Sequence, residues 1–355
     1  MILDGIILTS TSYLNKERSI SAIFHIITGK KSIQTVQDIH MYQLKSFYGV
    51  YPSLDKAVFQ KQIRYLIKED CLRICNEEKQ IYKLTPVGSR RLNEVGESST
   101  LKLLNGFRFA GLEKIYFDRL RLLLQTLINS RMGNFNFIPV IENKEVEVWV
   151  KWYYIKIKPT RSKVLLHFYE ELEMLLSRFP DIVAEMFVDR LTGYKNFGKS
   201  VYQLAQQYGV QKDEIQLQIT AYLHYILETV EREKDCFPYL ASIADDLSAN
   251  TSLTKTAQAT YQLLKNGMPV QRIARIRNLK INTIQDHIVE IALYDVHFPI
   301  EKYVSQADQQ EIINAHVETN SYKLSVIKEH VPNRIDYFQI RLVLAVLNHG
   351  VKIGE

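Results

Sequence analysis

The chain has 355 residues, 46% of them hydrophobic and 24% charged, which is enough apolar content for several folded cores and excludes a disordered scaffold. Its 45 basic and 39 acidic residues leave a formal charge of +6. So small an excess favours a polyanionic partner only where the positive charges gather on one face.

Targeting and metal signals are weak throughout the sequence. The first residues, MILDGIILTSTSYL, have neither a positive leader nor an apolar run typical of a secretory signal, and no stretch approaches the ~20 apolar residues of a membrane span. Cys71, Cys75 and Cys236 lack the pairing of a zinc site, and we expect the first two to be buried or half-buried structural thiols. We therefore expect a cytoplasmic protein with no membrane contact, no metal and no cofactor.

The first 97 residues predict three helices followed by a β-hairpin. The predicted elements are helices over 20–28 and 33–47 and from Leu54, strands over 72–75 and 81–84, and a closing helix from Thr85-Pro86. Gly29 is expected to end the first helix, and Gly49 with Pro52 the second. This order of elements resembles a winged helix.

The third of these helices has a basic face. Its apolar residues recur at helical spacing, at Val58, Phe59, Ile63, Leu66 and Ile67. The opposite face, a possible second DNA-binding surface, carries Lys56, Gln60, Lys61 and Arg64. On the hairpin, Arg73, Lys79 and Lys83 suit phosphate, whereas Glu77 and Glu78 would repel it. A winged fold used for protein contact or dimerisation is therefore an equal alternative.

The middle region, 98–180, is predicted to be helical. Residues 101–127 are expected to form a core helix. The segment 135–157 fits both spacings equally, a strand through Val146, Val148, Val150 and Trp152 and a helix through Val146, Trp149, Val150, Tyr153 and Ile157. Of the two we favour a helix. Within it, KWYYIKIKPTRSK (151–163) interleaves aromatic and basic residues, as in surfaces that stack on unpaired bases. We favour the alternative, in which the aromatic rings are buried and the lysines lie at the rim.

Residues 193–200, GYKNFGKS, satisfy the P-loop pattern G-x-x-x-x-G-K-[ST]. A P-loop works when a buried strand delivers it into a helix, yet the preceding DIVAEMFVDRLT has helical spacing. We interpret the segment as the loop that enters a helix-turn-helix over 200–219, with Ser200 as the helix cap and Gly209 at the corner. We expect this unit to be architectural, because its outward face is nearly neutral. An ATPase that uses Lys199 is kept as the third functional alternative.

A second helix-turn-helix is predicted over 261–294. Ala274 falls where two helix axes approach closely, and Asn278 tolerates the left-handed conformation of a sharp corner. The apolar residues Leu279, Ile284 and Ile288 are expected to seat the second helix. They and Ala274 repeat the spacing of Ala205, Val210, Ile215 and Ile219, at a constant offset of 69 residues, as from 205 to 274.

The surface of this second unit is predicted to be basic, because the run from 265 to 280 contains five cations and no acid. The residues expected to contact phosphate are Arg272, Arg275, Arg277 and Lys280, and those expected to reach base edges or further phosphates are Asn282 and Gln285. Asp286 on the same face slightly favours the alternative, a helix-turn-helix that only packs against another protein.

The string LLKNGMPVQRIARIRNLKINTIQDHI resembles the helix-turn-helix module at the C-terminal end of many bacterial RecQ-type DNA helicases. Residues 324–349 are similar to the closing helices of that module, with Asp336 and Gln339 placed for a capping box. Lys280 departs from the pattern, since related motifs commonly have Ser there, and so the cap is poorer. With no helicase motor expected ahead of the module, the chain resembles the stand-alone YpbB-like accessory proteins of low-GC Gram-positive bacteria. That resemblance implies a RecQ-like helicase as partner.

The sequence thus predicts a mainly α, multi-domain protein. Its expected parts are a winged-helix domain (1–97), a helical middle (98–180), a helix-turn-helix-like helical domain (181–250) and a helicase-associated helix-turn-helix domain (251–355). The predicted function is that of a non-enzymatic DNA-binding accessory protein of a RecQ-like helicase in DNA repair or recombination, located at the nucleoid. A helix-turn-helix transcription regulator is the first alternative, and a P-loop ATPase the next.

Overall fold

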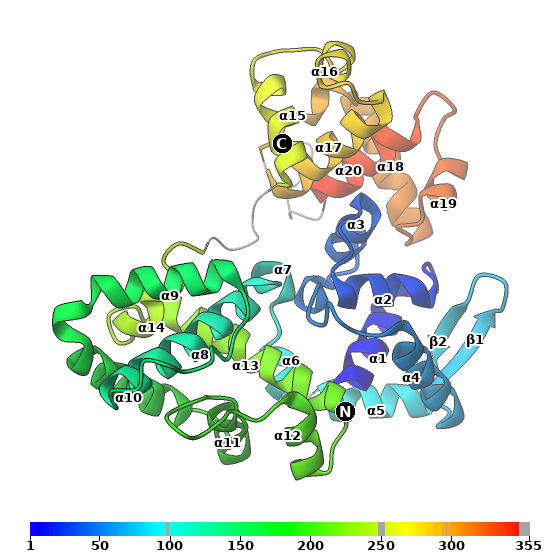
Figure 1. Cartoon of the computed structure of the whole chain (residues 1–355). Helices are drawn as coiled ribbons and strands as arrows, with labels where there is room; N and C mark the ends of the chain where they lie inside the picture. The colour runs from blue at the N-terminus through cyan, green and yellow to red at the C-terminus, as the bar shows by residue number, and fades with distance from the viewer. Residues whose placement is uncertain (97–98, 248–252, 296, 348–355) are drawn as a thin grey trace. The chain divides into compact units, whose positions relative to one another are not determined.

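A computed structural model describes residues 1–96, 99–247, 253–295 and 297–347 (Figure 1). The chain is mainly helical, as predicted. It divides into two compact units, each made of several segments. Unit 1 comprises 1–7, 49–62 and 89–250, and unit 2 comprises 8–48, 63–88 and 251–355. None of the helices among the described residues combines the length and apolar character needed to cross a bilayer.

The N-terminal elements follow the predicted winged-helix order. They are α1 (Ile2–Leu14), α2 (Ile20–Thr28), α3 (Ile33–Met41), η1 (Lys45–Phe47), α4 (Lys56–Lys68), β1 (Leu72–Asn76), β2 (Ile81–Leu84) and α5 (Pro86–Gly96). Gly29 ends α2 in the left-handed conformation, with φ 69°, as expected. The two strands pair antiparallel, with Leu72 opposite Leu84.

Three expectations for this region were incomplete or wrong. The apolar helix α1 was not among the predicted elements. The second predicted helix stops at Met41 rather than at Phe47, because Gln43 turns the backbone into the left-handed region with φ 55° and η1 follows. Cys75 is exposed, while Cys71 is buried as expected. Cys71 lies just before β1, and within β1 only Leu72 is buried, so Cys75 shares the exposure of the outer part of the hairpin.

Unit 1 is built around a long central helix, α13. Its other helices after residue 98 pack around α13 or around α8. The elements are α6 (Ser99–Lys102), α7 (Gly106–Phe109), α8 (Leu112–Arg131), α9 (Lys144–Lys156), η2 (Lys158–Thr160), α10 (Arg161–Leu176), α11 (Asp181–Asp189), α12 (Val201–Tyr208), α13 (Lys212–Arg232) and α14 (Pro238–Ser242). Helix α13 contacts α6, α7, α8, α11, α12 and α14 (Figure 1).

The middle region agrees with the sequence only in part. The single helix expected over 101–127 is wrong: α6, α7 and α8 are separate, and Gly111 adopts φ 87° ahead of α8. The helix favoured within 135–157 is confirmed for α9, where Trp149, Val150 and Tyr153 are buried. Residues from 109 to 243 share one hydrophobic core, which runs across the expected boundary at 180. The other two expected boundaries coincide with 97–98 and 248–252, outside the described residues.

The C-terminal part of unit 2 is arranged around another central helix, α17. The elements are α15 (Lys255–Lys265), α16 (Val270–Arg277), α17 (Ile281–Tyr294), η3 (Ile300–Lys302), α18 (Gln306–Thr319), α19 (Leu324–Glu329) and α20 (Tyr337–Leu347). Helix α17 contacts α15, α16 and α20, and also α3 from the N-terminal segment of the same unit. The capping box predicted for the last helix is present, since the Gln339 amide donates to Asp336 Oδ1 at 2.8 Å and the Asp336 amide donates to Gln339 Oε1 at 2.9 Å.

Candidate nucleic-acid interface

Helices α16 and α17 meet at the corner that the sequence predicted. Asn278 ends α16 in the left-handed conformation, with φ 49° and ψ 48°. The Leu279 amide then donates to the Ala274 carbonyl at 2.9 Å, which closes the turn. Ala274 of α16 is buried between the helices, and Ile284 and Ile288 on the inner face of α17 are fully buried. The two helices therefore form a seated helix-turn-helix.

Four of the predicted contact residues are exposed around this corner, namely Arg272, Arg275, Lys280 and Asn282. Over the described ranges, the three cations among them form no ion pair with a carboxylate. Lys280 is the N-cap of α17 and provides no side-chain cap bond, as its side chain has no acceptor. The three ammonium and guanidinium groups are thus open to a phosphate.

Arg277 has a different role from its neighbours. Its Nη1 donates to the Thr256 carbonyl at 2.6 Å and to the Thr260 hydroxyl, both on α15. His287 Nδ1 lies 2.8 Å from the same hydroxyl and 3.4 Å from Arg277 Nη1. Burial and the Arg277 charge lower the pKa of His287, so the ring is neutral and accepts through Nδ1. This cluster ties α15 to α16 and α17.

The outward surface of α17 is limited to its first turn. From Ile288 to Leu293 the helix is buried against its neighbours. Gln285 and Asp286 are half-buried, and the Asp286 carboxylate pairs with Arg341 Nη1 of α20 at 2.7 Å. Arg341 Nε also donates to Gln37 Oε1 of α3 at 3.1 Å. The Asp286 charge that seemed from sequence to oppose DNA is therefore neutralised within the unit.

Two apolar residues at the corner were missed by the sequence analysis. Ile276 is 55% exposed at the end of α16, and Ile281 is 46% exposed at the start of α17. Spacing gave no signal of their exposure, because Ile276 follows the buried Ile273 by three residues and Ile281 precedes the buried Ile284 by three, which are positions on one helix face. The candidate surface therefore combines cations, one amide and two apolar side chains.

Comparison with known proteins shows the family of this chain. A family model described as a helix-turn-helix domain matches residues 256–344. Protein YpbB of Bacillus subtilis (strain 168) is 30% identical over 342 residues, which are 96% of each chain. The chain belongs to the YpbB family. No solved structure matches it. The YpbB-like resemblance is thus confirmed, and the helix-turn-helix domain supports DNA binding by this YpbB-family protein.

The N-terminal surface of this YpbB-family protein is exposed as the sequence suggested. The four residues of the basic face of α4 are all exposed, at Lys56, Gln60, Lys61 and Arg64. The apolar face is less uniform, since Phe59 and Leu66 are buried while Val58 and Ile67 are partly exposed. On the hairpin, Arg73 lies only 3.8 Å from Asp70 at a solvated position, so that pair restrains it little.

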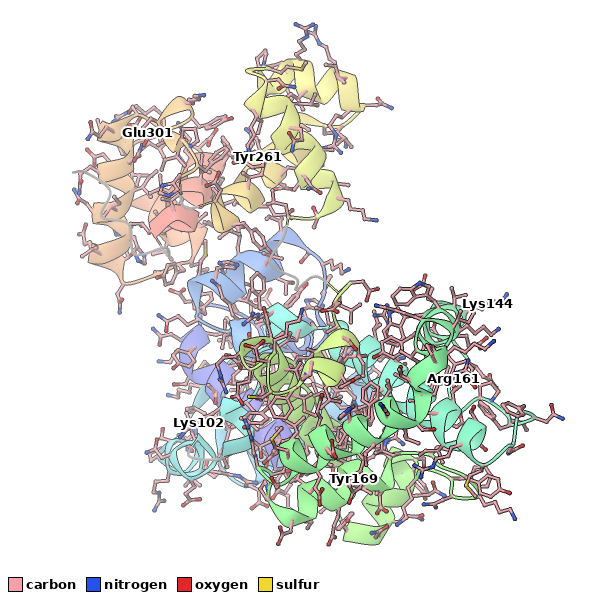
Figure 2. The ribbon with its side chains drawn as sticks, turned by 90° about the vertical axis from the view of Figure 1, so that its left-hand side faces the viewer. Lys102, Lys144, Arg161, Tyr169, Tyr261 and Glu301 are labelled. Carbon is pink, nitrogen blue, oxygen red and sulfur yellow. The ribbon has the colours of Figure 1, made fainter. Side chains whose placement is uncertain are left out.

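The aromatic rings of the stretch 151–163 are partly buried and partly exposed, so each of the two predicted alternatives fits some of them. Tyr153 is buried. The guanidinium of Arg161, a residue labelled in Figure 2, lies 3.5 Å from the ring centre of Tyr154. Trp152 is instead 55% exposed, with the Lys156 ammonium 5.0 Å from its ring. The favoured alternative, buried rings with lysines at the rim, therefore holds for the tyrosines and not for Trp152.

The P-loop pattern at 193–200 lacks the context that nucleotide binding requires. Helix α11, not a strand, precedes it. The Lys199 ammonium is held by Asp189 Oδ2 at 2.9 Å and Gln207 Oε1 at 2.7 Å. Ser200 caps α12 in a capping box with Gln203. The segment is the loop into the first helix-turn-helix, as interpreted from sequence. No cluster of potential metal ligands is found in the part of the chain that the structure describes.

Proposed function

We propose that this protein is a non-enzymatic DNA-binding accessory factor of a RecQ-like DNA helicase, working in repair or recombination at the nucleoid. The observation that carries the proposal is the open cationic corner of the second helix-turn-helix, formed by Arg272, Arg275 and Lys280. Because phosphate contacts supply most of the affinity of proteins for DNA of any sequence, such a corner suits a factor that follows a helicase along DNA.

In the proposed complex, the three open cations contact phosphates, and Asn282 with Gln285 reaches base edges or further phosphates. Only the first turn of α17 enters the groove, as helix-turn-helix proteins use the N-terminal residues of the second helix. Ile276 and Ile281 would meet thymine methyl groups or sugars. For Arg277 we propose a structural role in place of the expected phosphate contact, since its guanidinium holds α15.

The basic face of α4 is proposed as a second contact with DNA. Its three cations and one amide are exposed and lie within nine residues of helix, from Lys56 to Arg64. Contacts of this kind add affinity without sequence preference. Two separate cationic surfaces would give a steeper dependence of binding on salt than either one alone.

Binding to DNA of different forms tests the first part of the proposal. We expect forked and duplex DNA of mixed sequence to bind, with affinity falling linearly on a log–log plot against salt. A regulator that recognises one operator would instead prefer a single sequence by about 10³-fold or more. Absence of DNA binding at about 50 mM salt, where phosphate contacts are strong, would exclude the proposal.

Co-purification tests the helicase part separately. The tagged protein should retain a RecQ-like helicase from extract of its own cells after nuclease treatment, since a contact through shared DNA would be lost in that step. A tagged unrelated DNA-binding protein is the control. Retention of the helicase only before nuclease treatment would contradict a direct partnership and leave DNA binding intact.

A further inference from the structure

Unit 1 contains a cavity whose walls carry several buried charged groups. It has a volume of about 430 Å³, in the range of small-molecule sites, and lies between α8, α13 and the segment 50–53. Charged and polar side chains that line it include Glu113, Asp118, Arg121, Arg190 and Gln216. Nothing in the DNA-binding proposal uses this cavity.

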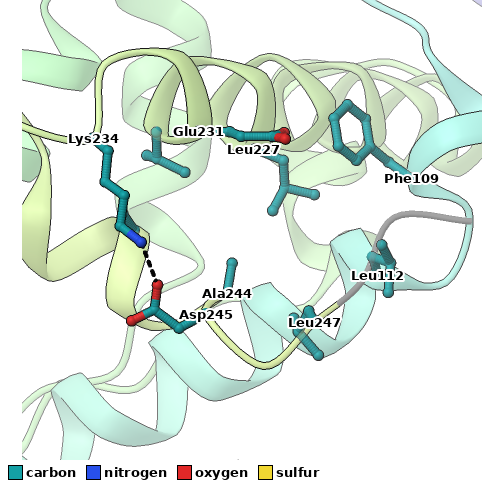
Figure 3. Close-up of a pocket in the computed structure, with 10 residues that line it drawn as sticks. Phe109, Leu112, Leu227, Glu231, Lys234, Ala244, Asp245 and Leu247 are labelled. Atoms are coloured by element: carbon teal, nitrogen blue, oxygen red, sulfur yellow. Dashed lines mark hydrogen bonds and ion pairs between the residues drawn. The ribbon is translucent and has the colours of Figure 1, made fainter. Parts of the chain in front are cut away.

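A second hollow in the same unit differs from this cavity in how its charged groups are paired (Figure 3). Its walls are mostly apolar, and its charged groups are already paired. Lys234 contacts Asp245 at 2.8 Å, and Glu231 accepts from Arg108 Nη2 at 2.7 Å. That hollow therefore offers a ligand no unsatisfied charge.

The charged cavity has an excess of guanidinium groups. Arg121 is only 8% exposed, and its Nε donates to the Arg190 carbonyl at 3.1 Å. Its carboxylate partner is Asp118, whose Oδ1 lies 3.9 Å from Arg121 Nη1. The other oxygen of Asp118 accepts from Lys114 Nζ at 2.7 Å. Arg190 Nε is buried with no hydrogen-bond partner. Burial, followed by the charge of Arg121, lowers the pKa of Arg190 to about 10.

The remaining carboxyl in the cavity compensates little for this excess. Glu113 is 6% exposed at the start of α8, and its Oε2 is buried without a partner. Burial raises the pKa of Glu113 to about 7, against the opposing effect of the helix amides around it. Near neutral pH this group is therefore partly protonated, and the two guanidiniums are left without a full counter-charge.

The rest of the wall is apolar. Phe117 of α8 faces the cavity together with Ile219 and Leu223 of α13. A purely inorganic anion would leave these side chains without contact. An anion that carries an apolar body would satisfy both parts of the wall.

We propose that the cavity binds a small organic anion, with its phosphate or carboxylate group held by Arg121 and Arg190 and its apolar body against Phe117, Ile219 and Leu223. A guanidinium pairs with either acid group through two parallel hydrogen bonds. The proposal is independent of DNA binding, since the cavity and the DNA surface share no residue.

Titration calorimetry on the full chain tests this site with four probes: phenyl phosphate, benzoate, inorganic phosphate and acetate. We expect saturable binding of one molecule per chain for at least one of the probes with a ring. That probe should bind about tenfold more tightly than its counterpart without a ring, because contact with the apolar wall adds roughly 1.4 kcal/mol. The acid group of the tighter probe distinguishes phosphate from carboxylate.

Substitution localises the binding. Arg190→Gln should weaken the best probe at least about tenfold, since one charged hydrogen bond is lost. Arg232→Gln is the matched control, because this arginine is exposed on α13, outside the cavity, and its loss changes the net charge equally. Circular dichroism melts of both variants check that the fold is retained.

A measurement on the unmodified protein avoids any folding effect of the substitution. Phenylglyoxal modifies accessible arginines, and peptide mass spectrometry locates the products. Phenyl phosphate or benzoate should slow the modification of Arg121 and Arg190 and leave Arg232 unaffected. The proposal is overturned if no probe binds at roughly 10 mM, weaker than any specific site of this kind. It is overturned equally if the best probe binds Arg190→Gln unchanged and protects neither arginine.

Discussion

The two helix-turn-helix segments of this chain have the same corner but different surroundings. In the first, Gly209 (φ 63°) joins α12 to α13, and in the second, Asn278 (φ 49°) joins α16 to α17. The second helix of each is the central helix of its own unit. In the first segment Asp213 accepts from the Tyr51 hydroxyl at 2.5 Å, whereas its counterpart 69 positions later, Asn282, is exposed.

The difference shows that a repeated fold can present different surfaces. In the first segment, the start of α13 fastens other parts of unit 1, since Glu214 Oε2 also accepts from the Ile2 amide at 2.8 Å. In the second segment, Asn282 is exposed and Thr283 is half-buried at the same positions. The exposed Arg272 and Arg275 stand where the first segment has Gln203 and Gln206. The first segment holds parts of unit 1 together, and we propose that the second segment contacts DNA.

The largest expected effect concerns the open cations. Replacing Arg272, Arg275 and Lys280 together by Ala should weaken DNA binding about 100-fold, since roughly 1 kcal/mol per exposed charged contact accumulates over three sites. The slope of log affinity against log salt should become shallower by about three. Fluorescence anisotropy with mixed-sequence duplex over a salt series measures both quantities.

The control removes the same charge from unit 1. Lys102, Lys144 and Lys151 are exposed, and their joint replacement by Ala should leave the affinity within about threefold of the unmodified protein, because these lysines belong to neither surface proposed to contact DNA. Equal losses in both triple variants would mean that net charge alone governs binding.

The next prediction compares the structural role of Asp213 with the proposed DNA contact of Asn282, its equivalent in the second segment. Asp213→Ala should lower the free energy of unfolding by about 1–3 kcal/mol, because it leaves the buried Tyr51 hydroxyl without its acceptor. Asn282→Ala should change it by less than about 0.5 kcal/mol and weaken DNA binding instead. Urea denaturation of both variants measures the free energy. A stability loss of similar size in the two would remove the distinction.

The two corners should respond differently to substitution. Gly209→Ala should cost about 1 kcal/mol through backbone strain alone, because no atom lies within 4 Å of the added Cβ. Asn278→Gly should be neutral to within about 0.5 kcal/mol, since Gly relieves the strain but enlarges the entropy of the unfolded chain. Thermal melts compare both with the unmodified protein. A large loss for Asn278→Gly would mean that the asparagine side chain has a further role.

The smallest expected effect is on pH dependence. His287 corresponds to Gln218 of the first segment, and its pKa is lowered by burial and by Arg277. A base with a lowered folded pKa stabilises the fold above its unfolded pKa, near 6.5, and that contribution is lost as pH falls through this range. His287→Gln should therefore lose less stability than the unmodified protein between about pH 7 and 5. Parallel loss in both would show that His287 does not contribute.

Prediction from sequence succeeded where neighbouring residues decide the structure. The left-handed corners, the Ser200 and Asp336 caps and the hairpin depend on backbone preferences within a few residues. It failed for 101–127, where helical spacing continues through Gly111 although the backbone turns there with φ 87°. Apolar periodicity records burial, and burial persists across a break when both pieces pack on the same core.

By itself, the sequence determined the mainly helical class, the two repeated corners and the basic character of the second one. Only the tertiary structure decided which side chains are open: Arg277 turns inward to α15, Asp286 is neutralised by Arg341, and Asp213 is buried against Tyr51. It also brought Arg121 and Arg190 to one cavity. The reason is physical, because a hydrogen bond or ion pair between distant residues depends on how helices pack, and local residue preferences carry no record of that packing.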